Sequence, residues 1–349
     1  MLNVFDVAVA GGGPAGASCA ALCARAGLRT LVLEKAIFPR EKVCGDCLNP
    51  ACWPVLEKLG IAERVLAQTH ARLENLEFIS PRGRTLRVSL GALRSGEIAI
   101  KRSLLDSVLL NRARELGAEV RENTPVTALE NGWKIETTNG AFSARVLVAA
   151  DGRNSTVARL LGLLPAPAKD RVGLQTHLAA PPDFGMRVAM HFLPRGYCGI
   201  ANVGGGELNV CLVSRPADLG EMKAWAAAHF SIASDHAWRT ITPLARAPVA
   251  LARENLLLAG DAARVVEPFT GEGIYYALAT GALAARHIIA GDLPGYAKAH
   301  AEIYRGRLWV NQLAKMAVLH PSFATAVLGI ANLYPPLLRF LTAKVVGAR

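Results

Sequence analysis

The segment Val4–Ala26, VFDVAVAGGGPAGASCAALCARA, decides the fold of this chain. Its first part, Val4–Ala10, is a short apolar run, which is typical of a buried strand. Glycines follow at once, and Pro14 then suits the first turn of a helix that we expect over Pro14–Ala26. The next apolar run, Arg29–Leu33, predicts a second strand. The chain therefore begins with a βαβ unit, which predicts a parallel sheet.

The glycines between the first strand and the helix fit the pattern G-x-G-x-x-G. Gly11 would permit the tight turn, Gly13 would let the backbone approach a pyrophosphate at the positive end of the helix, and Gly16 would allow close helix–strand contact. Glu34 ends the second strand about 20 residues later, where a carboxylate binds ribose hydroxyls. A carboxylate favours FAD or NAD over NADP. The alternative is a surface acid that merely ends a strand.

Beyond this unit the pattern of the chain changes several times. Leu73–Ala99 contains the pattern of a hairpin, Val172–Val213 is rich in strands, and Gly273–Ala290 is typical of a helix. These changes predict an α/β fold in which a second domain is threaded through the first. The predicted division is 1–72, 98–165 and 246–300 for the nucleotide-binding domain, 73–97 and 166–245 for the substrate domain, and 301–349 for a helical C-terminal cap.

Composition limits the partners and the compartment. The 349 residues are 52% hydrophobic and carry a net charge of +11, but no dense Lys/Arg block with interleaved aromatics occurs, so nucleic acid is disfavoured. Seven cysteines, an odd number, and an N-terminus that runs directly into a strand indicate a cytoplasmic location without a disulfide framework.

The C-terminal segment Leu308–Arg349 is apolar and basic. It could cap a pocket, form a dimer surface, or lie on the inner face of an anionic membrane and admit a lipid-like substrate. Within it, Met316–Leu338 lacks charged residues, but three prolines argue against a simple membrane span. We expect the cap, with peripheral membrane contact as the alternative, and leave the oligomeric state open.

Two further stretches carry a resemblance to a known family. VLVAADGRNSTVARLLG contains Asp151-Gly152, and LLLAGDAARVVEPFTGEGIYYAL contains Gly260-Asp261. With the glycine turn, they resemble the three ordered signatures of the flavin monooxygenase superfamily. This resemblance implies an FAD-dependent oxidoreductase with a Rossmann-type FAD-binding domain and an inserted β-rich substrate domain, as in glutathione reductase and p-hydroxybenzoate hydroxylase.

The resemblance also implies roles for single residues. Asp261 is expected to hold a ribityl hydroxyl of FAD, Asp151-Gly152 to border the pyrophosphate and a nicotinamide approach, and Arg102 to contact FAD. A helix beginning after Pro268–Gly273 would point its dipole at the flavin edge that gains negative charge on reduction. The expected cofactor-binding residues are Gly11, Gly13, Pro14, Ala15, Gly16, Glu34, Lys35, Cys44, Gly45, Arg102, Asp151, Gly152, Gly260, Asp261, Pro268, Gly271, Gly273 and Ile274.

Within the superfamily the chain resembles the geranylgeranyl reductase-like branch. The resemblance lies in Lys42-Val43-Cys44-Gly45 and in the stretch Pro268–Tyr276. That branch carries an aromatic lipid-pocket motif, which here reads Tyr197-Cys198-Gly199-Ile200-Ala201-Asn202. Tyr197 is retained, but Gly199, Ala201 and Asn202 replace a Trp, a Phe and a Pro. The smaller side chains would leave room for a bulkier or more polar substrate.

Cys44-Gly-Asp-Cys47 is a C-x-x-C pair without the second pair or His cluster that zinc requires, so no metal is expected. Cys47 would begin the following helix. Both cysteines are either packing residues or couple chemically to the flavin. The candidate catalytic residues are Cys44, Cys47, Tyr197 and Glu272, and His191 and Glu267 are further candidates for proton transfer.

Four functions can be weighed against these residues. The favoured one is a monooxygenase that hydroxylates an apolar aromatic, polyketide-like or lipid-like molecule with reduced FAD, with NADH or NADPH as a transient electron donor. The alternative is a reductase of isoprenoid double bonds. A halogenase is disfavoured, because the sequence lacks the tryptophan-rich signature of that group. A non-catalytic lipid escort would not require Glu34, Arg102, Asp151 and Asp261 together.

Overall fold

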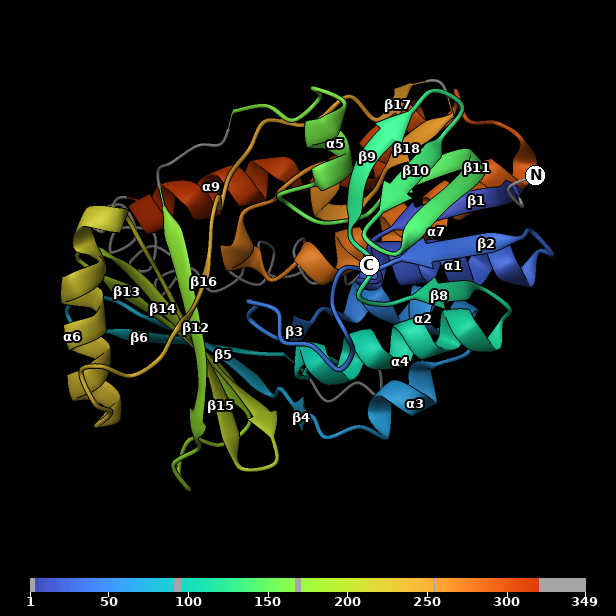
Figure 1. The fold of residues 1–349 in the computed structure, drawn as a ribbon. Coiled ribbons are helices and arrows are strands. Elements are labelled where there is room, and N and C mark those ends of the chain that lie inside the picture. Colours follow the sequence, from blue (N-terminus) through green and yellow to red (C-terminus); the bar gives the residue numbers. More distant parts are fainter. Residues whose placement is uncertain (1–3, 91–95, 167–170, 254, 320–349) are drawn as a thin grey trace.

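The computed structural model describes residues 4–90, 96–166, 171–253 and 255–319. Its main features are two large sheets, with most of the helices gathered around the first (Figure 1). The first sheet has the order β17-β18-β11-β1-β2-β8, and β10 and β9 extend it from β11. Its strands are β1 (Val4–Ala10), β2 (Thr30–Leu33), β8 (Glu119–Arg121), β9 (Val126–Glu130), β10 (Lys134–Thr137), β11 (Gly140–Ala149), β17 (Ala252–Arg253) and β18 (Leu256–Leu258).

The centre of the first sheet is parallel, as the βαβ pattern predicts. Strand β1 pairs in parallel with β2 and β11, and β11 pairs in parallel with β18. Helix α1 (Pro14–Arg25) packs against α4 (Arg102–Glu115) and α7 (Gly273–Ala290). A Cβ at Gly281 of α7 would overlap the carbonyl oxygen of Ala15, so glycine lets α1 and α7 approach closely.

The second sheet is built from two separate parts of the chain. Its order is β16-β12-β15-β14-β13-β5-β6, and only the β13–β5 pair is parallel. Helix α6 (Leu219–Phe230) covers one face of it (Figure 1). The strands are β5 (Asn75–Ile79), β6 (Thr85–Ser89), β12 (Val172–Ala179), β13 (Arg187–Leu193), β14 (Gly196–Gly204), β15 (Glu207–Ser214) and β16 (Arg239–Ile241).

A small sheet lies where the chain passes between the two large ones. It consists of β3 (Cys47–Leu48), β7 (Ile98–Ala99) and β4 (Ala71–Arg72), all antiparallel. Helices α2 (Trp53–Leu59) and α3 (Ala62–Leu66) lie in the connection between β3 and β4, and α5 (Thr156–Leu160) follows β11.

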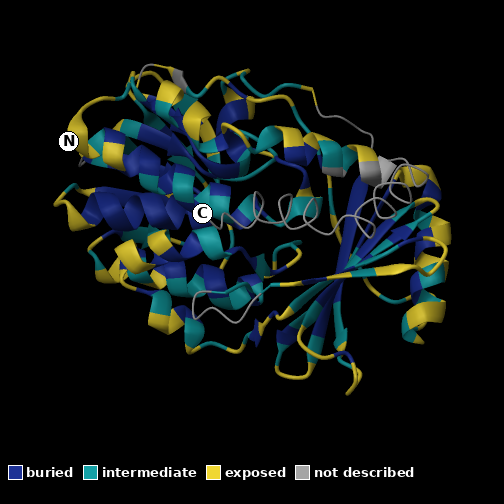
Figure 2. Cartoon of the chain, turned by 180° about the vertical axis from the view of Figure 1, so that it is seen from behind, coloured by how far each residue is buried: buried dark blue, intermediate teal, exposed yellow. Residues whose placement is uncertain are grey.

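Buried residues concentrate in α1 and in the strands of both sheets (Figure 2). Separate apolar clusters lie on either side of each large sheet. The predicted α/β class with a β-rich insertion is therefore confirmed, while the predicted domain boundaries stay a prediction.

Helices α8 (Tyr296–Tyr304) and α9 (Leu308–Leu319) close the described part of the chain, in agreement with the expected helical C-terminus. None of the helices within the described ranges combines the length and apolarity needed to cross a bilayer. Most of the segment predicted to cap the pocket or contact a membrane, 320–349, lies outside the described residues.

Candidate active site

The glycine turn after β1 has the geometry that the sequence predicts. Gly11 has a φ of +101°, which favours glycine, and a Cβ at Gly16 would overlap the Gly11 carbonyl oxygen. Helix α1 starts without a side-chain cap, and Gly13, Pro14 and Ala15 line a cavity at its first turn. The free N–H groups and the dipole of this helix end form a site for an anion.

Glu34 lies at the end of β2 and is 5% exposed. Its Oε2 accepts a 2.6 Å hydrogen bond from the Gly12 N–H, and its Oε1 accepts a 2.9 Å bond from the Ala36 N–H. The carboxylate thus pins the glycine turn while also lining the cavity. Carboxylate oxygens can each accept more than one hydrogen bond, so ribose recognition remains compatible with these contacts.

Three positive side chains, Arg40, Lys42 and Arg102, gather beside the turn near one buried carboxylate, Asp106. Arg102 donates two 2.8 Å hydrogen bonds to the buried Asp106, and Arg40 lies 3.1 Å from the same carboxylate. Lys42 lines the cavity nearby, and no ion pair to it is found among the described residues. Burial, and secondarily the charge of Arg102, lowers the pKa of Lys42 to about 8. An anionic group would relieve this excess of positive charge.

The two signature aspartates hold the edges of the cavity. Asp151 Oδ2 accepts hydrogen bonds from the N–H groups of Thr156 (2.6 Å) and Val157 (3.1 Å) and so caps α5. Its other oxygen, Oδ1, is buried without a protein partner among the described residues, and burial raises the pKa of this carboxyl. Asp261 Oδ2 accepts hydrogen bonds from Arg153, whose Nη2 lies 2.9 Å away. Both aspartates line the cavity.

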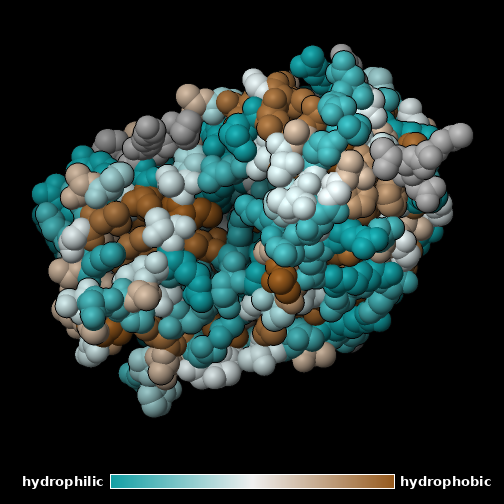
Figure 3. All heavy atoms as spheres, viewed as in Figure 1, coloured by the Kyte–Doolittle hydropathy of each residue, from teal (hydrophilic) through white to brown (hydrophobic). Residues whose placement is uncertain are grey.

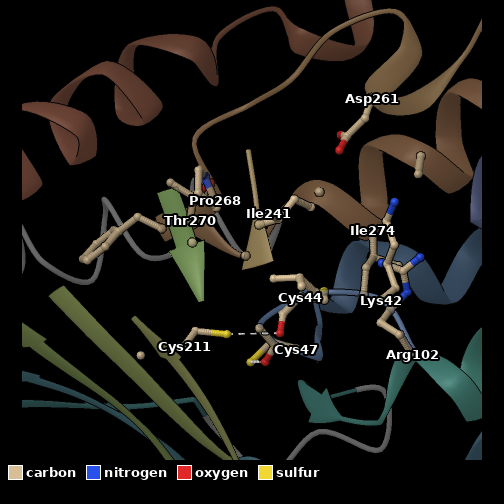
Figure 4. A pocket seen from close by; sticks show the side chains of 18 of the residues that line it. Lys42, Cys44, Cys47, Arg102, Cys211, Ile241, Asp261, Pro268, Thr270 and Ile274 are labelled. Carbon is tan, nitrogen blue, oxygen red and sulfur yellow. Dashed lines mark hydrogen bonds between the residues drawn. The ribbon is translucent and has the colours of Figure 1, made fainter. Parts of the chain in front are cut away.

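The loop before α7 reaches the cavity from the opposite side. Pro268–Thr270 forms a single 3-10 turn, Gly271 has a φ of +68°, and α7 begins at Gly273 without a side-chain cap. Figure 4 places Pro268, Thr270 and Ile274 around the same space as Lys42 and Arg102. Helix α7 therefore begins at the cavity, where the sequence predicts that its dipole faces the flavin edge.

Glu272, a candidate catalytic residue, does not line this cavity. Its carboxylate is 1% exposed and accepts hydrogen bonds from Tyr276 (3.1 Å), Arg307 (3.2 Å) and Asn311 (2.9 Å). These contacts fasten α9 to the start of α7. The geometry supports a structural role, and the catalytic role stays a prediction.

Three thiols gather where the loop between β2 and β3 meets the second sheet. Cys44, Cys47 and Cys211 all line the cavity, and the Cys44 carbonyl oxygen accepts a 3.2 Å hydrogen bond from Cys211 Sγ (Figure 4). The same oxygen accepts a 2.7 Å hydrogen bond from Asn209 Nδ2. All three are free, and burial raises the pKa of each thiol. No group of three metal-binding side chains occurs among the described residues.

The expected position of Cys47 is wrong. It lies in β3 and not at the start of a helix, because the backbone after Gly45 pairs with β7 before the helical turn begins at Pro50. No helix dipole is therefore available to stabilise its thiolate.

The other half of the cavity is apolar and belongs mainly to the second sheet. Val188, Met190 and Phe192 line it from β13, and Tyr197 lines it from β14 with Gly199 and Ala201. The Tyr197 ring lies edge-on to Phe269 at 5.3 Å, and burial raises the pKa of its hydroxyl. The whole cavity has a volume of about 710 Å³ and joins the glycine turn to this apolar wall without interruption. Figure 3 shows a hollow between the two halves of the molecule.

Two further proton-transfer candidates lie away from the cavity. His191 faces Trp225 and His229, at 5.6 and 5.2 Å between ring centres, on the α6 side of the sheet. Glu267 forms a buried two-point ion pair with Arg171, with N–O distances of 3.0 and 2.8 Å. Neither side chain lines the cavity.

Sequence reasoning missed several ionisable residues of the cavity, among them Lys42 and Glu97. Glu97 lies just before β7, and burial raises the pKa of its carboxyl to about 7. Lys42 stands within a recognised motif, so its basic charge beside the glycine turn was a usable signal. Glu97 offered no signal, because only pairing of β7 with β3 brings it to the cavity.

The residues present fit FAD. A glycine turn with an open helix start and surplus Arg and Lys suits a diphosphate, and Glu34 suits the ribose. Every residue that we expected to bind the cofactor lines the cavity except Gly16, which makes the close contact behind the turn. The individual contacts of these residues with FAD stay predictions.

Comparison with curated proteins agrees with this site. The chain is 30% identical to menaquinone reductase of Mycobacterium tuberculosis over 348 residues, covering 88% of this chain and 79% of that protein. It is 30% identical to digeranylgeranylglycerophospholipid reductase of Methanoculleus marisnigri, covering 84% and 79%. It is also 29% identical to conditioned medium factor receptor 1 of Dictyostelium discoideum, and this alignment covers 82% of this chain but only 64% of that protein.

Solved structures share the fold at lower identity. A flavoprotein/dehydrogenase from Cytophaga hutchinsonii superposes with a TM-score of 0.85 at 23% identity and covers 99% of this chain and 93% of that one. A flavin-dependent brominase gives 0.81 at 21% identity, with coverage of 99% and 94%.

The FAD binding domain family matches residues 4–192, more than half of the chain. Together with the 30% identical reductases, this match assigns the cofactor that the cavity geometry fits. The chain belongs to the FAD binding domain family and is an FAD-dependent oxidoreductase.

Proposed function

We propose that the chain reduces a carbon–carbon double bond in the prenyl chain of a quinone or lipid. Menaquinone and digeranylgeranylglycerophospholipid, the compounds in the names of the two reductases, differ in their head groups but both carry isoprenoid chains. The unit common to both is the prenyl double bond. These relatives favour reduction over the hydroxylation that the sequence motifs alone favoured.

The observation that carries the proposal is the continuity of one cavity from the nucleotide turn to an apolar wall. The lining that the second sheet contributes within the described residues is apolar except for the Tyr197 hydroxyl and the Cys211 thiol. Such a wall suits a hydrocarbon chain, because contact with it removes apolar surface from water.

Reduction of an isolated double bond requires a hydride and a proton. Reduced FAD supplies the hydride when bound. The proton must come from a group whose pKa lies near the working pH. The Glu97 carboxyl lines the cavity, and burial raises its pKa to about 7, which meets this condition. Burial instead moves the pKa values of the Cys44 and Cys47 thiols and of the Tyr197 hydroxyl further above the working pH. We therefore assign the proton to Glu97, ahead of those three.

The test is a single anaerobic turnover. Holoenzyme reduced with dithionite is mixed with a menaquinone bearing four prenyl units, and the product is analysed by mass spectrometry. A gain of two hydrogens in the prenyl chain with return of the oxidised flavin spectrum is expected. A gain of one oxygen atom, seen only after air is admitted, would instead establish hydroxylation.

Hydroxylation remains the second candidate because Gly199 and Ala201 leave more room than the lipid motif of the branch.

Glu97→Gln should lower the rate of the reductive turnover about 100-fold or more while the protein keeps its FAD. Glu74→Gln, at an exposed carboxylate, is the matched control. A Glu97→Gln rate equal to the wild-type rate would remove Glu97 from the proposal.

A further inference from the structure

Three cross-strand pairs of β13 and β14 build the apolar wall of the cavity. Val188 lies opposite Ala201, Met190 opposite Gly199, and Phe192 opposite Tyr197. Side chains alternate between the two faces of a strand, so these pairs share the face that lines the cavity. Of the residues between them, Ala189, Cys198 and Ile200 belong to the cluster under α6.

The two ends of this wall differ in bulk. At the Phe192–Tyr197 end, Phe78 and Phe269 complete an aromatic group. The three phenylalanine rings lie 5.4 to 6.4 Å from one another, and the Tyr197 ring lies 5.3 Å from Phe269. At the other end the β14 residues opposite Met190 and Val188 are small, Gly199 and Ala201. The aromatic end is closed by rings that contact one another, whereas the other end is filled by flexible or smaller side chains, Met190 and Val188 of β13 and Leu76 of β5.

The Met190 side chain occupies the space that Gly199 leaves open. A Cβ at Gly199 would lie 3.2 Å from Met190 Sδ and 3.5 Å from Met190 Cε. The thioether therefore rests directly over the glycine. Methionine has three rotatable side-chain bonds and adapts to irregular space, so it can move where an aromatic side chain could not.

We propose that Met190, resting over Gly199, is a movable side chain that sets how long a prenyl chain the cavity accepts. We call the pair Met190 and Gly199 the gauge. This inference rests on the proposed function, since it concerns the chain that the reductase binds. A short chain is accommodated with Met190 in place. A longer chain displaces the thioether along the groove above Gly199 and Ala201.

The gauge predicts opposite effects for its two partners. Gly199→Val pushes the thioether into the cavity, because the new side chain takes the space in which Met190 rests. Met190→Ala empties that space. Combining the two substitutions places the bulk on β14 in place of β13, so much of the wild-type behaviour should return.

The experiment measures binding of naphthoquinones with one, two, three and four prenyl units to the oxidised holoenzyme, followed by the change in flavin absorbance. For Gly199→Val the Kd of the four-unit quinone should rise about tenfold, and that of the one-unit quinone no more than about threefold. Met190→Ala should shift the preference toward the longest chain. Cys198→Ala, on the same strand but facing α6, should leave the order of affinities unchanged.

Three outcomes decide the matter. If Gly199→Val and Met190→Ala shift the length preference in opposite directions and the double variant restores it, the gauge is supported. If wild type binds the quinones but Met190→Ala keeps the wild-type length order, the gauge is refuted while the proposed function stands. If wild type binds none of the four quinones, both fall. Should Gly199→Val fail to fold, Met190→Ala alone decides between the first two outcomes.

Discussion

The two halves of the cavity are made in different ways. The nucleotide half depends on backbone geometry and charge, with Gly11, Gly16 and Glu34 within one βαβ unit. The apolar half depends on side chains from strands far apart in the chain, such as Phe78 of β5 and Met190 of β13. Backbone positions tolerate almost no change, whereas an apolar wall tolerates exchanges of similar volume. We therefore expect substitutions in the first half to abolish cofactor binding and those in the second to alter selectivity.

The largest effect is expected at Gly16. Gly16→Ala places a methyl group onto the Gly11 carbonyl oxygen, and since both partners are backbone, the turn must open. Purified Gly16→Ala should be colourless, with a loss in the free energy of unfolding of about 4 kcal/mol or more. Gly220→Ala, also in a helix but with nothing within 4 Å of the new Cβ, should retain its colour. A yellow Gly16→Ala protein would refute the expectation that the backbone of the nucleotide half tolerates almost no change.

The next largest effect is expected at the ion pair of Arg171 and Glu267, which joins the two halves of the cavity. Arg171 precedes β12, and Glu267 precedes the Pro268 loop, and their ion pair is 2% and 5% exposed. Arg171→Met leaves Glu267 buried without its partner and should lower the free energy of unfolding by about 3–5 kcal/mol in chemical denaturation. Arg195→Met, which removes the half-exposed Arg195 from Glu221 and Asp218 while Asp218 keeps Arg215, should cost about 1 kcal/mol at most. Equal losses would contradict the assignment of Arg171 as a joint.

The pH dependence of FAD affinity should distinguish the nucleotide half. Below pH 8 the Lys42 ammonium is charged in the free protein and attracts the diphosphate. Above pH 8 it is neutral, so FAD binding must take up a proton and the affinity falls, by up to about tenfold per pH unit. Titration of apoprotein with FAD from pH 7 to 9 measures this. Lys42→Met should flatten the profile, and the exposed Lys58→Met should not.

The smallest effect is the pH dependence of the apolar half. Glu97 is neutral below its pKa of about 7 and charged above it. Quinone binding, which further removes water from this carboxyl, should therefore weaken by a few-fold between pH 6 and pH 8, since desolvation disfavours the charged form. Glu97→Gln should bind with one affinity across this range. If Glu97→Gln and wild type followed the same curve, Glu97 would not face the bound ligand.

The contrast between the halves also explains what the sequence could reveal. The turn, Glu34 and Asp261 stand at fixed local spacings after strands, so their places at the cavity could be predicted. Met190, Glu97 and Cys211 reach the cavity only because distant segments come together, namely β13 with β5, β7 with β3, and Cys211 with Cys44, which no local pattern records. Cys47 was misplaced for the same reason, because its pairing with Ala99 overrides the helical tendency of the residues that follow.

Glu272 illustrates a different limit. Its position in the signature loop suggested a site near the flavin, and the side chain does stand at the start of α7. Its orientation is set by Arg307, which directly precedes α9, and by Asn311 of α9, a helix whose packing the sequence did not indicate. A motif can thus locate a residue on an element without giving the direction of its side chain.

A crystal structure of the protein with FAD bound tests the central claim most directly, namely that both halves form one site. We expect the diphosphate at the Gly13–Ala15 amides beside Lys42 and Arg102, and the ring between Cys44 and the Thr270 loop, open to the wall around Met190. A ring turned to solvent, or separated from Met190 by protein, would contradict the account.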